Sequence, residues 1–262
     1  MSTPLRPAAA YLTRASITSS LKVELRRLTR SGLGLGVLVG FAFFGLSGPV
    51  LSIYMPEILG AAASTDQLAI SASQATPADA ISLFNQSAMQ LGLIVTVAVA
   101  ITSIGWDTRP GSSIFYRTRV HRLSTVLLPR LIIDWLIALA TYSCGLLLAV
   151  VVTASAIGRP PAGMVVRTWM ACGLYIVMAM SIGHLIAASL RRTTTAIALT
   201  TLLVLVLPVM NQVPGTSRWV PTALLLPTGL HAMPVVVSLV VTGLCAVGSV
   251  LIAGRQTLRR DA

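Results

Sequence analysis

Residues 135–158, WLIALATYSCGLLLAVVVTASAIG, contain no Lys, Arg, Asp or Glu, and they decide the fold class of this chain. A helix needs roughly 20 consecutive apolar residues to cross about 30 Å of hydrocarbon. Because every backbone N–H and C=O must be bonded internally in lipid, such a stretch is a helix unless it belongs to a barrel. Barrel strands alternate polar and apolar residues, and this stretch does not. It therefore predicts a membrane-spanning helix.

Five further uncharged stretches flank this one, at residues 31–56, 80–106, 168–190, 193–217 and 219–254. The last is too long for one span, and Pro221, Pro227 and Pro234 interrupt its first third. Proline breaks the continuity of a helix. We therefore expect a short re-entrant segment at about 216–231 on the outer side, followed by a sixth span at about 233–254.

The sequence thus predicts an all-α integral membrane protein with six transmembrane helices. Only 10% of its 262 residues are charged, whereas soluble domains carry roughly 25%. We expect one transmembrane domain over residues 31–254, between a tail at 1–30 and a tail at 255–262. The six spans are expected at about 31–54, 84–105, 128–156, 165–189, 195–212 and 233–254.

The distribution of basic residues predicts the orientation. Sixteen of the nineteen Lys and Arg residues fall at the ends that face one side, and only Arg159, Arg167 and Arg218 face the other. The positive-inside rule assigns the richer side to the cytoplasm. We therefore expect a multi-pass protein of the cell membrane, the inner or plasma membrane of a bacterium, with both termini cytoplasmic. Because the net charge of +12 is spread over span ends, it does not indicate a partner nucleic acid.

The last residues before the first span predict a helix lying in the membrane interface. Ile17, Leu21, Leu25 and Leu28 recur at helical spacing, and charged residues, Glu24 among them, occupy the other positions. Such a helix binds anionic lipid headgroups through its basic face. A basic tail without this helix is the alternative. In the first span, the spacing of Gly36 and Gly40 (GxxxG) predicts the close approach of another helix.

No motif predicts catalysis on this chain. The sequence contains no GxxxxGK[ST] phosphate loop, no nucleophile elbow, no HExxH and no carboxylate pair within a span. The three cysteines lie in different spans, so neither a disulfide nor a zinc site is indicated. We therefore expect no catalytic, metal or cofactor site here, and no enzyme activity in the chain alone.

Two ionisable positions lie near or within spans. Asp134 follows Arg130 by four residues, which predicts a neutralising pair on one helix face, with a role in gating as the alternative. His184 lies in the fourth span, where a charged group is a functional hypothesis. With no acidic partner evident in a span core, we expect a hydrogen-bonded packing histidine rather than a proton relay.

The segment 106–126 between the second and third spans contains Asp107, Gly111-Ser112 and the element Arg119-Val120-His121-Arg122, and Arg130 follows it. This arrangement resembles that of the permease subunits of type-2 ABC exporters. Those carry an acidic residue four positions before a Gly-Thr, then an amphipathic helix, an element ending in Arg, and a basic residue where the third span starts. Here Asp107, Gly111-Ser112, Arg119-Val120-His121-Arg122 and Arg130 occupy these positions. Asp replaces Glu, Ser replaces Thr, the proline of the element is missing, and Arg122 falls about one residue early.

The resemblance implies a coupling helix that docks on a separate ATPase subunit. Its residues would be Asp107, Gly111, Ser112, Phe115, Tyr116, Arg117, Arg119 and Arg122. A solvated basic loop would explain the arginines but not the interleaved aromatic residues.

The resemblance also implies the partners and the activity. Two permease subunits, identical or homologous, would act with two cytoplasmic ATPases that bind ATP and Mg²⁺ and export an amphipathic drug, peptide antibiotic or lipid-linked molecule. We expect spans one, two and five to line its path, with Asn85, Gln86, Asn211 and Gln212 as polar residues near the outer ends.

Three other functions remain open. A secondary transporter would need paired repeats or intramembrane carboxylates, and only Asp134 is evident. A membrane-embedded enzyme would need catalytic residues converging at one depth. A non-transporting sensor or assembly protein is the third alternative.

Overall fold

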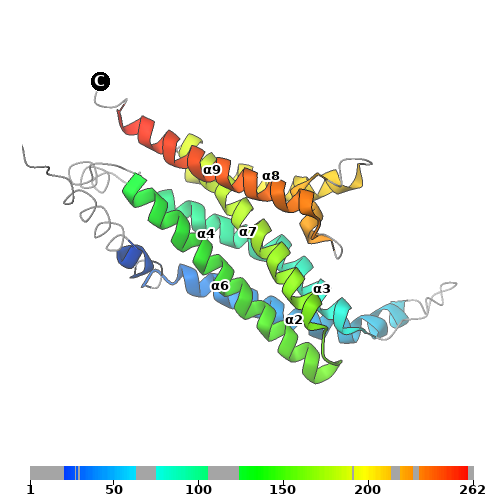
Figure 1. The fold of residues 1–262 in the computed structure, drawn as a ribbon. Helices are drawn as coiled ribbons and strands as arrows, with labels where there is room; N and C mark the ends of the chain where they lie inside the picture. The colour runs from blue at the N-terminus through cyan, green and yellow to red at the C-terminus, as the bar shows by residue number, and fades with distance from the viewer. Residues whose placement is uncertain are drawn as a thin grey trace, which may run out of the picture.

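The chain folds as a helical bundle in a computed structural model that describes residues 21–26, 28, 30–62, 75–105, 124–190, 192–213, 219–226 and 230–258. These residues form helices and short links, with no strand among them. Six helices are long and apolar enough to span a membrane (Figure 1). The expected all-α class and the six apolar helices are therefore confirmed.

Two of the six spans change helix type along their length. The second contains a π-helical turn, η1, and the fifth ends in a 3₁₀-helix, η3. The elements are α2 (Leu33–Ala62), α3 (Pro77–Ser87), η1 (Ala88–Gly92), α4 (Leu93–Gly105), α6 (Ser124–Ala156), α7 (Ala162–Leu190), α8 (Thr193–Val206), η3 (Leu207–Gln212), η4 (Pro221–Leu225) and α9 (Ala232–Leu258).

The connection after the first span is shorter than the sequence suggested. Helix α2 continues to Ala62 and α3 already begins at Pro77, so parts of the stretch expected between the first span at 31–54 and the second at 84–105 are helical. A capping box starts α3: the Asp79 N–H donates to Thr76 Oγ1 at 3.3 Å, and the Thr76 N–H donates to Asp79 Oδ2 at 3.1 Å. The Thr-Pro-x-Asp pattern that makes this cap is visible in the sequence.

The bundle has two distinct ends (Figure 1). Residues 21–26, the start of α6 and the end of α9 lie at one end, which we call the terminal end. The opposite end holds the α6–α7 link and η4. Within η4, Thr222, Ala223 and Leu224 are buried. Thus a compact 3₁₀ turn occupies part of the segment 216–231 and packs on the bundle. Its re-entry into the membrane stays a prediction.

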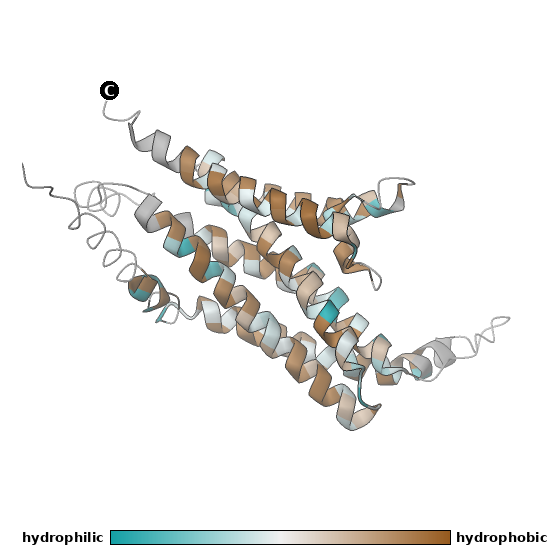
Figure 2. Cartoon of the chain, viewed as in Figure 1, coloured by the Kyte–Doolittle hydropathy of each residue, from teal (hydrophilic) through white to brown (hydrophobic). Residues whose placement is uncertain are grey.

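Helix α7 is the most buried span, and α8 and α9 are the least buried. Leu35, Val39, Phe43, Leu46 and Val50 are all exposed and follow one face of α2. Hydrophobic residues likewise colour the visible side of α6 and α9 (Figure 2). Soluble monomers rarely expose apolar surface of this extent, so the outward faces suit lipid.

Glycines bring α2 into backbone contact with α6 and α3. A Cβ atom on Gly145 would lie 2.6 Å from Phe41 O, and one on Gly48 would lie 2.7 Å from Phe84 N. A Cβ on Gly45 would clash with Gly145 O. The predicted contact at Gly36 and Gly40 is wrong within the described chain, where nothing lies within 4 Å of either added Cβ. The close approach is further along the same helix because Gly45 and Gly48 face α6 and α3.

We expect Gly45→Ala and Gly145→Ala to destabilise the protein. Each added methyl group meets backbone that cannot rotate away, and overpacking of this kind costs about 1–3 kcal/mol. Gly40→Ala is the matched control on α2, because its methyl group enters open space. Thermal unfolding of the purified variants in detergent measures the difference. Equal melting temperatures for the three variants would contradict this account of α2 packing.

Candidate functional site

The predicted coupling residues lie outside the described part of the chain. These are Asp107, Gly111, Ser112, Phe115, Tyr116, Arg117, Arg119 and Arg122. Their role stays a prediction from the sequence. The structure instead provides two polar features within the bundle, a cavity at the opposite end and a buried ionic cluster at the terminal end.

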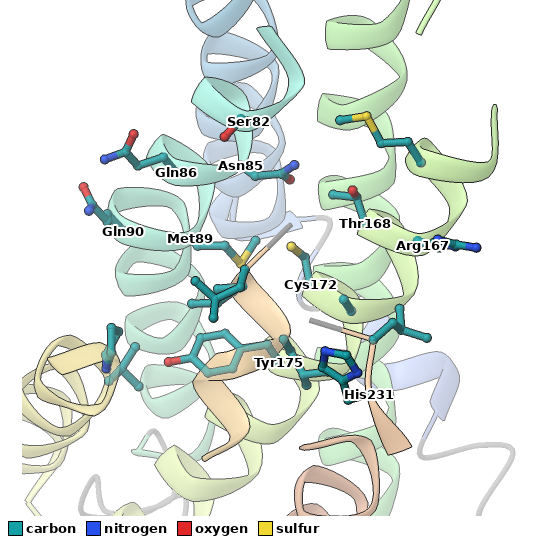
Figure 3. A pocket seen from close by; sticks show the side chains of 18 of the residues that line it. Ser82, Asn85, Gln86, Met89, Gln90, Arg167, Thr168, Cys172, Tyr175 and His231 are labelled. Atoms are coloured by element: carbon teal, nitrogen blue, oxygen red, sulfur yellow. The ribbon is translucent and has the colours of Figure 1, made fainter. Parts of the chain in front are cut away.

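A cavity of about 860 Å³ opens among the spans at the opposite end (Figure 3). Its walls come from α3 and η1, the first half of α7, the end of α8 and η4. The apolar lining includes Met89, Val204 and Leu224, and the polar lining comprises Ser82, Asn85, Gln86, Gln90, Arg167, Thr168, Tyr175 and His231. This mixture of groups and this volume are typical of small-molecule sites.

Two of the four residues predicted for a substrate path line this cavity. Asn85 and Gln86 are in its wall, whereas Asn211 is not among its described lining residues. The Thr222 hydroxyl donates to Asn211 Oδ1 at 2.9 Å and so ties η4 to η3. The side chain of Gln212 lies outside the described residues.

Of spans one, two and five, which we expect to line the substrate path, spans two and five contribute to this cavity, and α2 is absent from its described lining. Helix α7 forms that wall of the cavity instead, because α2 packs mainly against α6 and α3. Hydropathy identifies spans but not their neighbours in space, so the sequence contained no signal for this exchange.

Asn85 is fixed in the wall by hydrogen bonds of its own side chain. The Tyr142 hydroxyl donates to Asn85 Oδ1 at 2.8 Å, and Asn85 Nδ2 donates to Ile81 O at 2.9 Å. The ring of Tyr142 stacks on Phe84, with centroids 5.9 Å apart. Asn85 therefore acts first as a structural amide that joins α3 to α6.

The π-helical turn η1 shapes the wall next to Asn85. The Leu93 N–H donates to Ala88 O, five residues back, which adds a residue to the turn and shifts the side chains that follow. Met89 and Gln90 from this turn line the cavity. Single π-turns of this kind are frequent at functional sites.

The side chains in the described lining of the cavity that can carry a charge near neutral pH are basic. Arg167 and His231 line it, and no Asp or Glu belongs to its described lining. The Tyr175 hydroxyl is buried and has no hydrogen-bond partner within the described part of the chain. In Figure 3 its ring extends from α7 across the cavity, hydroxyl foremost. The cavity lining therefore offers the Tyr175 hydroxyl as a hydrogen-bond donor and the Arg167 guanidinium as a positive charge.

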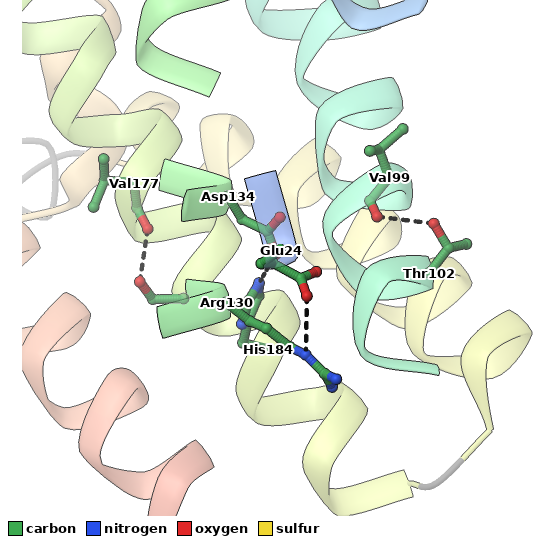
Figure 4. A network of polar contacts seen from close by, with 8 residues as sticks. Glu24, Val99, Thr102, Arg130, Asp134, Val177 and His184 are labelled. Atoms are coloured by element: carbon green, nitrogen blue, oxygen red, sulfur yellow. Dashed lines mark hydrogen bonds and ion pairs between the residues drawn. The ribbon is translucent and has the colours of Figure 1, made fainter. Parts of the chain in front are cut away.

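Four ionisable residues form the ionic cluster at the terminal end (Figure 4). Arg130 Nε lies 3.5 Å from Glu24 Oε2, and His184 Nε2 lies 3.4 Å from Asp134 Oδ2. Each of these residues is at most 4% exposed. The Arg130–Glu24 distance is that of an ion-pair contact rather than of a short hydrogen bond. The cluster joins residues 21–26 to α6 and α7.

The cluster corrects two sequence interpretations. His184 does have an acidic neighbour, Asp134, because α6 and α7 bring the two side chains together. We expected Glu24 on the charged, outward face of the helix before the first span, but it is buried, as is Leu28. Leu25, expected on the buried apolar face, is 48% exposed. The apolar face expected before the first span is therefore rotated. The intrahelical pair of Arg130 and Asp134 stays a prediction.

Comparison with protein-family models gives no match for this chain, and a search of the curated proteins gives none either. The functional argument therefore depends on the residues and their geometry.

We expect Glu24→Gln to destabilise the protein and to separate residues 21–26 from α6. Removing one partner of a buried ion pair leaves the other charge buried, at a cost of about 3–5 kcal/mol. The double variant Glu24→Gln/Arg130→Met should cost less than the sum of the two single variants, since both charges then disappear. Thermal unfolding measures the three variants, with Glu57→Gln, an exposed acid on α2, as control. Strict additivity would show that the contact contributes nothing.

Proposed function

We propose that this chain is the transmembrane permease subunit of an ATP-driven exporter of amphipathic molecules. The observation that supports transport is the cavity of about 860 Å³, whose wall combines apolar side chains with polar groups from several elements of the bundle. A cavity of this kind holds an apolar body and a polar head at once. It lies at the end that the charge pattern assigns to the outside.

The sequence of segment 106–126 supports ATP as the energy source. Its acidic start, its Gly-Ser, its aromatic residues and its arginines resemble the coupling segment of type-2 ABC permeases. The chain itself contains no phosphate loop. ATP and Mg²⁺ would therefore bind to separate cytoplasmic ATPase subunits, and a second permease subunit would complete the pathway.

The ionic cluster favours transport driven by an ion gradient as a second candidate. Asp134 and His184 form a buried acid–histidine contact between two spans, and such pairs can carry protons in transporters. Among the described residues, however, the cluster and the cavity share no side chain. The two functions differ in their energy source, which a transport assay separates.

Transport by the reconstituted protein should depend on ATP and on a co-expressed ATPase subunit. The chain alone should hydrolyse no ATP, because it lacks a phosphate-binding loop. Uptake of a fluorescent amphiphile into inside-out proteoliposomes measures both arms, with ATP or with an imposed pH gradient. Uptake driven by the pH gradient alone would instead support the second candidate.

Phe115→Ala, Tyr116→Ala and Arg122→Ala should each weaken binding of the ATPase subunit and abolish transport. Aromatic anchors at interfaces contribute on the order of 1–3 kcal/mol each, and arginines add charge-assisted hydrogen bonds. The six spans should remain folded in all three variants. Pull-down of the tagged ATPase from membranes measures the loss.

Arg192→Ala is the matched control for that experiment. Arg192 is an exposed basic residue in the link before α8, on the side predicted to be cytoplasmic. Its removal should leave ATPase binding unchanged. Undiminished binding by the three segment variants would show that residues 106–126 are a solvated loop.

A further inference from the structure

We propose that the cavity binds a neutral amphiphile through a ketone or ester carbonyl that accepts a hydrogen bond from the Tyr175 hydroxyl, with the apolar body of the ligand between η1, α8 and η4. The inference deepens the proposed function, because it names the ligand class of the same cavity. It rests on that function for the movement of the ligand and not for its binding.

The Tyr175 hydroxyl is a buried donor without a partner in the wall of the cavity. Tyr175 is 1% exposed, and its hydroxyl has no hydrogen-bond partner within the described part of the chain. In Figure 3 the ring extends into the cavity with the hydroxyl foremost. A buried polar group that lacks its hydrogen bond costs free energy. A ligand oxygen that accepts a hydrogen bond from this hydroxyl would remove that cost.

The position of Tyr175 along its span favours a ligand group without charge. Tyr175 lies near the middle of the 29-residue helix α7, and a charged group is costly at the centre of a bilayer. Arg167 is exposed and lies about 12 Å nearer the start of the helix. In Figure 3 it extends to one side, whereas the Tyr175 ring extends to the other, where the neutral side chains of Gln86 and Gln90 lie. The hydroxyl therefore faces neutral surroundings.

A carbonyl oxygen suits this hydroxyl better than an alcohol or an amine does. A tyrosine hydroxyl donates one hydrogen bond. A ketone or an ester brings an acceptor and no donor of its own, so one hydrogen bond pairs both groups. An alcohol or an amine would bring a further O–H or N–H into a largely apolar wall, where an unpaired donor costs free energy.

Apolar side chains from three elements account for the rest of the ligand. Met89 from η1, Val204 from α8 and Leu224 from η4 line the same cavity, and each is at most 7% exposed. Methionine adapts its shape to irregular chains. The volume of about 860 Å³ lies within the range of pockets for drug-sized ligands. A single alkyl chain that carries one carbonyl group therefore fits the cavity.

Equilibrium binding of radiolabelled undecyl methyl ketone to the purified chain tests this inference. The chain is held in nanodiscs of ether-linked phosphatidylcholine, which contains no carbonyl group, and the signal of empty nanodiscs is subtracted. We expect saturable binding. The unlabelled ketone should displace the probe at about fivefold lower concentration than its isostere, in which a methylene group replaces the carbonyl oxygen.

Charged probes of similar chain length test the neutral character of the ligand. Dodecyl phosphate and dodecyltrimethylammonium should displace the ketone only at higher concentration than the unlabelled ketone does, because their headgroups are costly to bury at the depth of Tyr175. Displacement by either at an equal or lower concentration would overturn the proposal. Binding of the ketone no greater than that of empty nanodiscs would also overturn it.

Tyr175→Phe then locates the carbonyl, because it removes the hydroxyl and keeps the ring. It should raise the Kd of the ketone about fivefold and leave the Kd of the methylene isostere unchanged, since only the ketone loses a hydrogen bond. Without ligand, its melting temperature should equal or exceed that of the unaltered protein, because a buried hydroxyl without a partner disappears. Tyr54→Phe, at an exposed tyrosine of α2 outside the described lining, is the matched control. Equal effects of Tyr175→Phe on both probes would refute the assignment of the carbonyl.

The experiment separates the ligand from the proposed function. Specific binding of the ketone without ATP-dependent transport would retain the cavity assignment and reject the exporter. ATP-dependent transport of charged amphiphiles with no binding of the ketone would retain the exporter and reject the ligand class.

Discussion

The close approach of α2 and α6 at Gly45 and Gly145 is the contact on which the rest of the bundle depends. It presses the Phe41 backbone against α6 and leaves the Phe41 ring between Tyr142, at a centroid distance of 5.8 Å, and Gly92 of η1. Tyr142 in turn holds Asn85 by a hydrogen bond. Without water to solvate polar groups, small residues and interhelical hydrogen bonds of this kind provide the association between helices in lipid. Helix α2 therefore supports the cavity wall through the contacts of Phe41 with Tyr142 and of Tyr142 with Asn85. No described residue of α2 lines the cavity itself.

Helix α7 contributes residues to both the cavity and the ionic cluster. Arg167 and Tyr175 lie in the cavity half of the helix, and His184 lies in the ionic cluster. Tyr175 and His184 are nine residues apart, which is about 14 Å along a helix axis. Helix α7 is continuous between these two residues and is the most buried of the spans. The cavity and the cluster are therefore best considered as two ends of one structural element.

The irregular elements contribute more to the cavity than the regular spans do. The π-turn η1 places Met89 and Gln90 in the wall, and η4 closes it with Leu224. Thr222 holds η4 against η3 through Asn211. Prolines at the start of η4 and within η3 remove backbone donors and favour short 3₁₀ turns over a continuous helix. One of these prolines, Pro221, is among the three that indicated a break in the sequence.

The sequence by itself determined the class of the protein: six apolar helices, the break before the last span, and near-correct bounds for α6, α7 and α9. These features follow from local composition, since a helix in lipid bonds its own backbone whatever its neighbours are. Asn85 and Gln86 were also found as cavity residues, because amides stand out in an apolar span. Only the tertiary structure decided that α7 rather than α2 lines the cavity, that Gly45 rather than Gly40 meets a neighbour, and that Asp134 faces His184. Each of these depends on the rotation of one helix against another, and that rotation is set by the packing of side chains far apart in the chain.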